Sequence, residues 1–266
     1  MSKGKFIVIE GIDGSGKSTL VNNLVEYFRT RKPPFRVAQL FEPTLDSPSA
    51  EAIQRALKTP PPEIERDNYE GDEPKGPEFQ IAEFKVDQAK GNAAEGTAAA
   101  KTDGLNKKIN PTKLNDTQTS SQKTLQLLRL FNEDRLWHLE NRIRPAVRDH
   151  DLTILDRYFF STAAYQGEGV NESREILQSN LRDPRIDQPD LVILLSINPQ
   201  RALERLQSRG KKIEVFEKLE SLNRIAQNYA ALFEEAPWEF PSHIVDASQK
   251  PDAVLADVIR HVCETL

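Results

Sequence analysis

Residues 11–18 read Gly-Ile-Asp-Gly-Ser-Gly-Lys-Ser and fit the pattern G-x-x-x-x-G-K-[ST]. An apolar run at 6–9, typical of a strand buried on both faces, precedes this stretch, and a predicted helix over 17–31 follows it. In that setting the glycines let backbone N–H groups turn toward phosphate oxygens, and the start of the helix adds positive potential. The stretch therefore predicts a site for nucleotide phosphates, formed by Gly11, Ile12, Asp13, Gly14, Ser15, Gly16, Lys17, Ser18 and Thr19.

Two side chains of this loop and two from a later strand predict the chemistry of the site. Lys17 is expected to reach the β- and γ-phosphates of the nucleotide, and Ser18 to ligate Mg²⁺. Asp156 follows the apolar run 152–155, so its carboxylate should emerge at the carboxyl end of that strand as a second Mg²⁺ ligand, a capping role being the alternative. Arg157 would place a guanidinium beside phosphates, where it stabilises developing charge.

Strands and helices are predicted to alternate outside the middle of the chain. The apolar pattern predicts further strands at 35–41, 191–197 and 244–245, and helices at about 49–57, 122–148, 200–208, 215–234 and 252–265. Such alternation implies parallel strands with right-handed crossovers. We predict one α/β domain over residues 1–266, a three-layer P-loop NTPase fold with a parallel sheet of about five strands and helices on both faces.

Residues 58–121 differ in composition from the rest of the chain. They are rich in Pro, Gly, Lys, Glu, Asn and Thr and contain few large apolar side chains. The composition favours an inserted, partly disordered or loosely packed segment within the domain. A small β-element around 79–86 is the alternative.

The overall composition excludes several classes of protein. The 266 residues carry 36 Lys and Arg against 41 Asp and Glu, a net charge of -5, so nucleic-acid binding is not expected. One cysteine, Cys263, rules out an internal disulfide framework and suits a reducing compartment. The four histidines lack metal-ligand spacing along the chain and are expected to be structural or exposed. The sequence has no apolar run long enough to span a membrane, and we predict a cytoplasmic protein.

Several motifs in order resemble the thymidylate kinase family of P-loop nucleoside-monophosphate kinases. The resemblance covers nearly the whole chain outside 58–121. It rests on residues 6–19, on Leu-Phe-Asn-Glu-Asp-Arg at 130–135, on Asp-Arg-Tyr at 156–158 with 161–167, and on 189–192, 209–210 and 245–248. It implies transfer of the ATP γ-phosphoryl group to a deoxynucleoside monophosphate, dTMP in the first place, with Mg²⁺ as cofactor.

The resemblance also implies roles for individual residues. Phe131 matches the residue that stacks on the thymine ring, and Arg135 the one that hydrogen-bonds the base. Asp13 and Arg157 match the groups at the acceptor's 3′-hydroxyl and phosphate, and both join Lys17 and Arg209 as implied catalytic residues. The other implied acceptor ligands are Glu42, Tyr165, which would favour deoxyribose, and Gln166.

Two departures from the family pattern concern phosphate binding. Phe41 stands where the family has an arginine before Glu-Pro, and Arg36 is the nearest guanidinium upstream. Val215 stands where a lid arginine is usual, so Lys211, Lys212 or Arg209 would cover the ATP phosphates instead.

These departures keep two further hypotheses open. The fold could serve another nucleotide or a nucleoside acceptor, or the chain could be a nucleotide-binding regulatory protein with little catalysis. The expected partners are small-molecule nucleotides and a second copy of the chain, with the helix at 122–148 as a candidate dimer surface.

Overall fold

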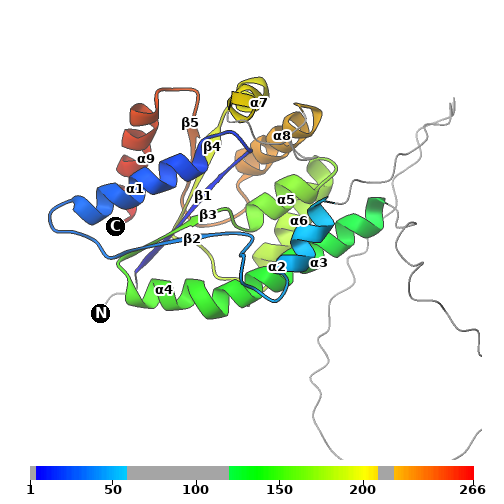
Figure 1. Ribbon diagram of the computed structural model, residues 1–266, viewed down its shortest axis with the longest axis horizontal. Coiled ribbons are helices and arrows are strands. Elements are labelled where there is room, and N and C mark those ends of the chain that lie inside the picture. Colours follow the sequence, from blue (N-terminus) through cyan, green and yellow to red (C-terminus); the bar gives the residue numbers. More distant parts are fainter. Residues whose placement is uncertain (1–3, 59–119, 209–218) are drawn as a thin grey trace, which may run out of the picture. The chain divides into compact units, whose positions relative to one another are not determined.

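In the computed structural model, which describes residues 4–58, 120–208 and 219–266, five parallel strands form a central sheet (Figure 1). The spatial order β2-β3-β1-β4-β5 places β1 in the middle. Its central strands are long apolar runs buried on both faces, which is why they read as continuous rather than alternating. The strands are β1 (Lys5–Gly11), β2 (Val37–Phe41), β3 (Leu152–Asp156), β4 (Leu191–Ser196) and β5 (Ser242–Asp246).

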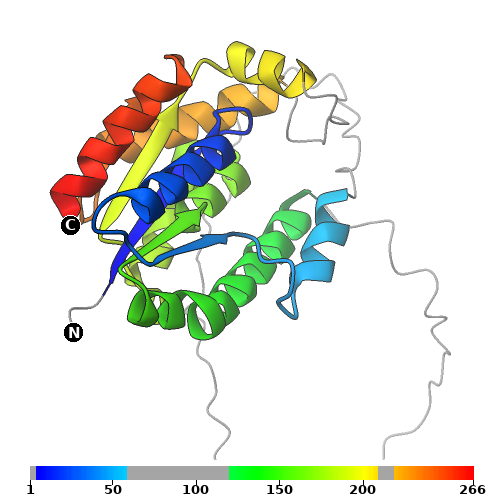
Figure 2. The same ribbon diagram turned by 60° about the vertical axis from the view of Figure 1, so that its left-hand side comes forward.

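Helices cover both faces of this sheet, which confirms the predicted three-layer fold. Helices α1 (Lys17–Thr30) and α9 (Pro251–Thr265) pack together on one face (Figure 2). The other face carries α3 (Ser120–His138), α4 (Arg144–Asp149), α5 (Phe159–Gln166), α6 (Val170–Arg182) and α8 (Leu219–Glu235). Helix α2 (Ala50–Lys58) packs against α3, and α7 (Pro199–Ser208) packs against α8.

The strand register decides which side chains meet at the carboxyl edge of the sheet. Ile9 lies opposite Asp156 on β3, and Asp156 lies opposite Phe41 on β2. On the other side of β1, Gly11 pairs with Leu195 near the end of β4. The loop after β1 and the turn after β3 therefore leave the sheet side by side.

The prediction of one long α-helix over 122–148 was wrong, because the helix is interrupted. A π-helical turn, η1 (Leu139–Ile143), separates α3 from α4. Arg135, Leu139, Ile143 and Val147 are all buried at steps of four residues. Each such step over-rotates an α-helix by about 40°, and one wider turn brings the buried side chains back to the same face.

Other predicted bounds also need correction. The second strand begins at Val37 rather than 35, and the helix predicted from 215 is described from Leu219 onward. Helices α5 and α6 were not predicted at all. Both predicted ends of the insertion, Lys58 and Ser121, belong to helices, and the remainder of 58–121 lies outside the described residues. None of the helices in the described ranges has the length and apolar character needed to cross a membrane.

Candidate active site

The loop at residues 11–18, called the P-loop below, joins β1 to α1 at the carboxyl edge of the sheet. Gly14 and Gly16 have φ angles of 80° and 101°, which L side chains rarely adopt. A Cβ atom on Gly14 would also lie 2.4 Å from the backbone oxygen of Ala202 in α7. Glycine at position 14 thus allows the backbone of α7 to approach the loop closely.

Lys17 is buried under this loop and bound to its backbone. Its Nζ donates hydrogen bonds to the carbonyl oxygens of Gly11, at 2.8 Å, and Ile12, at 3.0 Å. Burial lowers the pKa of Lys17 to about 8, and the charge of Arg157 acts in the same direction against the carboxylates of Asp13 and Asp156. The ammonium group therefore lies close to the expected phosphate position, and it loses its proton more readily than an exposed lysine does.

Ser18 and Asp156, the two predicted Mg²⁺ ligands, lie together next to the P-loop. The hydroxyl of Ser18 donates to Oδ2 of Asp156 over 3.1 Å. The other carboxylate oxygen, Oδ1, is buried and has no hydrogen-bond partner among the described residues. A hard cation prefers such oxygen ligands, so the pair fits Mg²⁺.

Arg157 turns back over the P-loop because its backbone is left-handed, with φ of 72°. Its side chain forms an ion pair with Asp13 and donates to the hydroxyl of Tyr165 at 3.0 Å. Burial disfavours the charge, but Tyr165 and Asp13 outweigh it and raise the pKa of Arg157. The guanidinium is thus a fixed positive charge beside the loop, and the strained backbone conformation is typical of functional positions.

Glu10 of β1, which the sequence analysis did not identify, binds the residues that follow Arg157. Its carboxylate accepts hydrogen bonds from the backbone N–H of Tyr158 at 2.7 Å and from the hydroxyls of Ser161 at 2.6 Å and Tyr229 at 2.8 Å. Burial raises its pKa, although these donors and Arg157 oppose the shift. A single acidic residue within the apolar β1 run was the signal that could have identified it.

Arg135 occupies a buried polar network rather than an open surface. Its guanidinium donates to Glu42 (3.1 Å), Asn180 (2.9 Å) and Thr162 (2.7 Å), and its side chain is 2% exposed. His138 Nδ1 also lies 3.3 Å from Glu42. Glu42 therefore bridges two basic side chains of α3, and Arg135 is held rigidly in place.

A buried carboxylate of α3, Asp134, binds the segment that follows β2. Asp134 accepts from the backbone N–H of Thr44 at 3.0 Å and from its hydroxyl at 2.5 Å. The hydroxyl of Ser47 also donates to Asp134. These buried bonds bring Glu42 up to Arg135 across 93 positions of sequence.

The remaining predicted site residues lie at several separate places in the fold or outside the described residues. Phe131 is half-buried on α3, and Gln166 is buried at the end of α5. Phe41 is 49% exposed at the end of β2. Arg36 pairs with Asp151 at the opposite, amino edge of the sheet, so it does not replace the arginine absent at position 41. Arg209, Lys211 and Lys212 lie outside the described residues.

A cavity of about 260 Å³ opens beside the P-loop. Arg205 of α7 reaches across it and donates to the backbone oxygens of Ala247, at 3.0 Å, and Ser15, at 3.4 Å. The lining comprises Ser15, Gly16, Thr19, Leu20, Asn23, Leu195, Arg205, Ser208, Ala247, Gln249, Pro251 and Val254. The sequence reasoning missed Arg205, because a single arginine on an amphipathic helix carries no signal of its own.

Comparison with known proteins identifies the family. A thymidylate kinase profile matches residues 104–258. A thymidylate kinase of Desulfotalea psychrophila is 29% identical over 99% of this chain and 96% of its own length, and one of Chromohalobacter salexigens is 27% identical over 100% and 98%. A thymidylate kinase of Xanthomonas euvesicatoria is 39% identical over 126 residues, 47% of this chain and 52% of its own. The profile covers more than half of the sequence, and the chain belongs to the thymidylate kinase family.

Proposed function

We propose that this enzyme transfers the γ-phosphoryl group of ATP to dTMP, giving ADP and dTDP. One observation carries the proposal. Lys17, Ser18, Asp156, Arg157 and Asp13 converge at the carboxyl edge of the sheet, where the P-loop and the turn after β3 leave it side by side. Parallel α/β sheets bind ligands at this edge.

The donor nucleotide fits the P-loop and the cavity beside it. Phosphate oxygens would accept from backbone N–H groups of the loop and from Lys17, which would leave the carbonyls of Gly11 and Ile12. The cavity lined by Arg205 and Gln249 is continuous with the loop residues Ser15 and Gly16 and suits the adenosine part.

Ser18 and Asp156 are the proposed holders of Mg²⁺. The support is the unpartnered buried Oδ1 of Asp156 and the hydroxyl–carboxylate pair. When bound, the ion neutralises charge on the β- and γ-phosphates. The chain's own part is to keep both oxygen ligands directed at the end of the P-loop.

The acceptor would lie between Arg157 and α3. The nucleophile is a phosphate oxygen that is already anionic, so catalysis needs positioning and charge neutralisation rather than a strong general base. Arg157 supplies a fixed positive charge, and Lys17 adds a second one when bound phosphates favour its ammonium form. Asp13 and Tyr165 would position the sugar. Phe131 and Gln166 would flank the base, and Arg135, held by Glu42, would hydrogen-bond it.

Phe41 favours a second candidate, a changed acceptor. An exposed phenyl ring at this position cannot bind the acceptor phosphate, and Arg36 is engaged at the far edge of the sheet. Losing one charge-assisted contact weakens binding by about 1.5–3 kcal/mol. The pocket could therefore bind dTMP weakly or favour another nucleotide.

An acceptor screen tests both candidates. The purified chain is incubated with ATP, Mg²⁺ and each common nucleoside, ribonucleotide and deoxynucleotide monophosphate, and ADP and diphosphate product are measured. Highest kcat/KM on dTMP supports the proposal, and preference for another acceptor supports the changed pocket. ATP binding without transfer to any acceptor would contradict both and support a regulatory nucleotide-binding protein. Lys17→Ala serves as the inactive control.

Dimerisation through α3 is proposed on a narrower basis. Leu125 is 53% exposed on this helix, so a second copy that packed on α3 would cover it. Sedimentation of wild type against Leu125→Glu tests it. A wild-type dimer that the charge converts to monomer is expected, and a monomeric wild type would overturn the proposal.

A further inference from the structure

A second cavity, of about 580 Å³, lies at the amino edge of the sheet, away from the P-loop. It is bordered by the first residue of β1, the start of β5 and the last turns of α9. Its lining residues are Lys5, Pro189, Asp190, Phe240, Pro241, His243, His261, Glu264 and Thr265. Nothing in the proposed transfer reaction uses this cavity.

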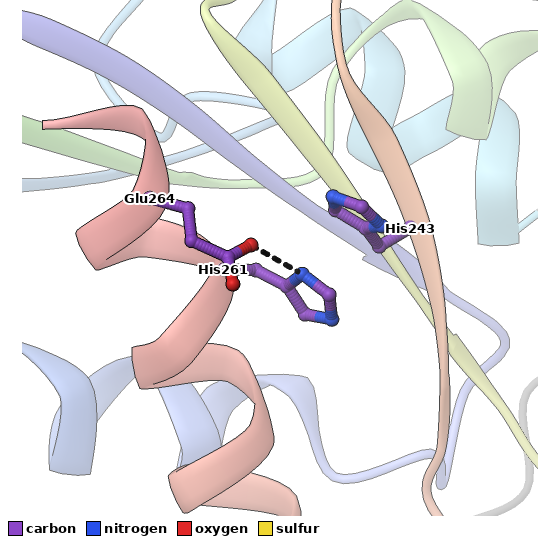
Figure 3. Close-up of side chains that lie close together, drawn as sticks. All are labelled: His243, His261 and Glu264. Carbon is purple, nitrogen blue, oxygen red and sulfur yellow. Dashed lines mark ion pairs between the residues drawn. The ribbon is translucent and has the colours of Figure 1, made fainter.

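Three side chains with metal-binding atoms converge in it (Figure 3). His261 and Glu264 are three residues apart on one face of α9, and His261 Nδ1 lies 3.5 Å from Glu264 Oε2. His243 comes from β5 and stacks on His261 with ring centroids 3.7 Å apart. One nitrogen or oxygen atom from each residue lies within 4.8 Å of the other two.

An independent feature of His261 indicates a missing ligand. The side chain is 10% exposed, and its Nδ1 is buried without a hydrogen bond from any described residue. The contact with Glu264 is an ion-pair distance that lacks hydrogen-bond geometry. A buried polar atom without a partner is uncommon in folded proteins and calls for an explanation.

We propose that His243, His261 and Glu264 form a binding site for a divalent transition-metal ion, with Zn²⁺ as the representative ion. Two imidazoles and a carboxylate are a ligand set that zinc accepts in tetrahedral sites, with water in the fourth position. Mg²⁺ prefers oxygen ligands and is not expected to bind there.

Binding requires two local movements. Stacked rings, here inclined by only 21°, direct their nitrogens in parallel, so one ring has to turn about its Cβ–Cγ bond. That torsion is soft, and His243 is only half-buried. Arg260 also donates to Nε2 of His261 at 2.9 Å and has to leave, because metal at Nδ1 moves the ring proton to Nε2.

The surroundings can accept these movements. Arg260 now pairs with Asp257 and Glu264, which the bound state would engage, but its side chain is 55% exposed and can turn toward solvent. Once Arg260 leaves, Asp257 Oδ1, now 3.7 Å from His261 Nε2, can accept a hydrogen bond from the Nε2–H group. A carboxylate on the far nitrogen is the common outer partner of a metal-binding histidine. The ion would then join the edge strand β5 to the last turns of α9.

Zinc titration of the tag-free full chain tests the proposal. Isothermal calorimetry with ZnCl₂ in excess Mg²⁺, which occupies the Ser18–Asp156 site, is expected to show one saturable site at micromolar concentration or tighter, and Zn²⁺ to raise Tm above its value with Mg²⁺ alone. His261→Ala, His243→Ala and Glu264→Gln should each weaken binding at least tenfold. His150→Gln, which removes a histidine outside the cavity, should bind as wild type does.

Two further measurements separate the site from nonspecific binding. Co²⁺ in its place should give the intense visible absorption of a tetrahedral ion, and the His243→Ala/His261→Ala double variant should lose it. Arg260→Gln should bind Zn²⁺ more tightly, since it removes a competing cation. Absence of saturable Zn²⁺ binding, or equal binding by the double variant whose metal-free Tm shows that it folds, would overturn the proposal.

Discussion

At the residue scale, the burial of the Lys17 ammonium group under the P-loop has a free-energy cost when no nucleotide is bound. Its ammonium group is buried against backbone carbonyls, and its pKa falls from 10.5 to about 8. Burying the charged form therefore costs about 3 kcal/mol below pH 8. This cost disappears as the pH rises from 8 to 10.5, because the unfolded chain binds the proton more tightly over that window.

ATP binding should therefore take up protons near pH 8.5. The phosphates favour the ammonium form and raise the pKa of Lys17, whereas at pH 6.5 the group is already charged and no uptake is expected. Calorimetric titration in two buffers of different ionisation enthalpy measures the proton count. Lys17→Arg is the control, since guanidinium stays charged at both pH values. Uptake that persists in this variant would assign it to another group.

Glu10 offers a second comparison at the residue scale. Glu10→Gln should destabilise the fold by about 1 kcal/mol, because the hydroxyls of Ser161 and Tyr229 can rotate to accept from the amide. Glu10→Ala leaves the backbone N–H of Tyr158 and one of the two hydroxyls without an acceptor, since the hydroxyls of Ser161 and Tyr229 can still bond each other, and should cost about 3 kcal/mol. Urea unfolding measures both, and equal losses would refute the role of the carboxylate.

The pH dependence of these variants has a defined sign. The folded pKa of Glu10 is raised above its unfolded value. Its contribution to stability is therefore fully present below the unfolded pKa and is lost as the pH rises through the folded one. Glu10→Gln should lack this slope.

At the element scale, the P-loop and α7 depend on one glycine. Gly14→Ala places a methyl group 2.4 Å from the carbonyl oxygen of Ala202 at a φ of 80°. We expect ATP affinity to fall more than tenfold, measured by calorimetry. Gly169→Ala is the matched control, because a Cβ there meets nothing within 4 Å. Similar losses in both variants would show that the close approach of α7 is unimportant.

Helix α6 was not predicted, yet it supplies Asn180 to the network around Arg135. Asn180→Ala should raise the KM for dTMP about tenfold and leave the KM for ATP unchanged, because a hydrogen bond to a charged group contributes about 1.5–3 kcal/mol. Asn171→Ala, on the exposed face of the same helix, should change neither constant. Steady-state kinetics with each substrate varied decides this, and a change confined to ATP would contradict the assignment.

The elements that the sequence predicts well are those with continuous apolar runs or a local motif. Residues 6–18 contain both, so the strand, loop and helix were all foreseen. Helix α5 was missed because it is only eight residues long and is buried nearly all round, which leaves no helical periodicity to read. Helix α6 was missed because only Ile176 and Leu177 are apolar among the three residues it buries. The π turn and the Glu42–Arg135 contact depend on packing between distant segments, which a single sequence does not display.

At the scale of the whole molecule, the described residues form one contact-defined unit, Met1–Pro61 with Thr119–Leu266. Replacing residues 62–118 by eight Gly and Ser residues should leave this unit folded. The shorter connection should lower the entropic cost of closing the loop, and so raise the free energy of unfolding, by about 2 kcal/mol, since each halving of loop length contributes about 0.6 kcal/mol. Urea unfolding and dTMP kinetics measure the outcome, and an unfolded product would show that the segment belongs to the core.

The helical path from α3 through η1 to α4 crosses the molecule from one edge of the sheet to the other. Arg135 lies on it at the carboxyl edge, and the carbonyl of Val147 accepts from Gly4 at the amino edge. The extra residue in the π turn sets the rotation of one half against the other. Deleting Glu140 would restore an α-helix but rotate the two halves by about 100°. This enzyme should therefore tolerate substitutions in that turn far better than any change in its length.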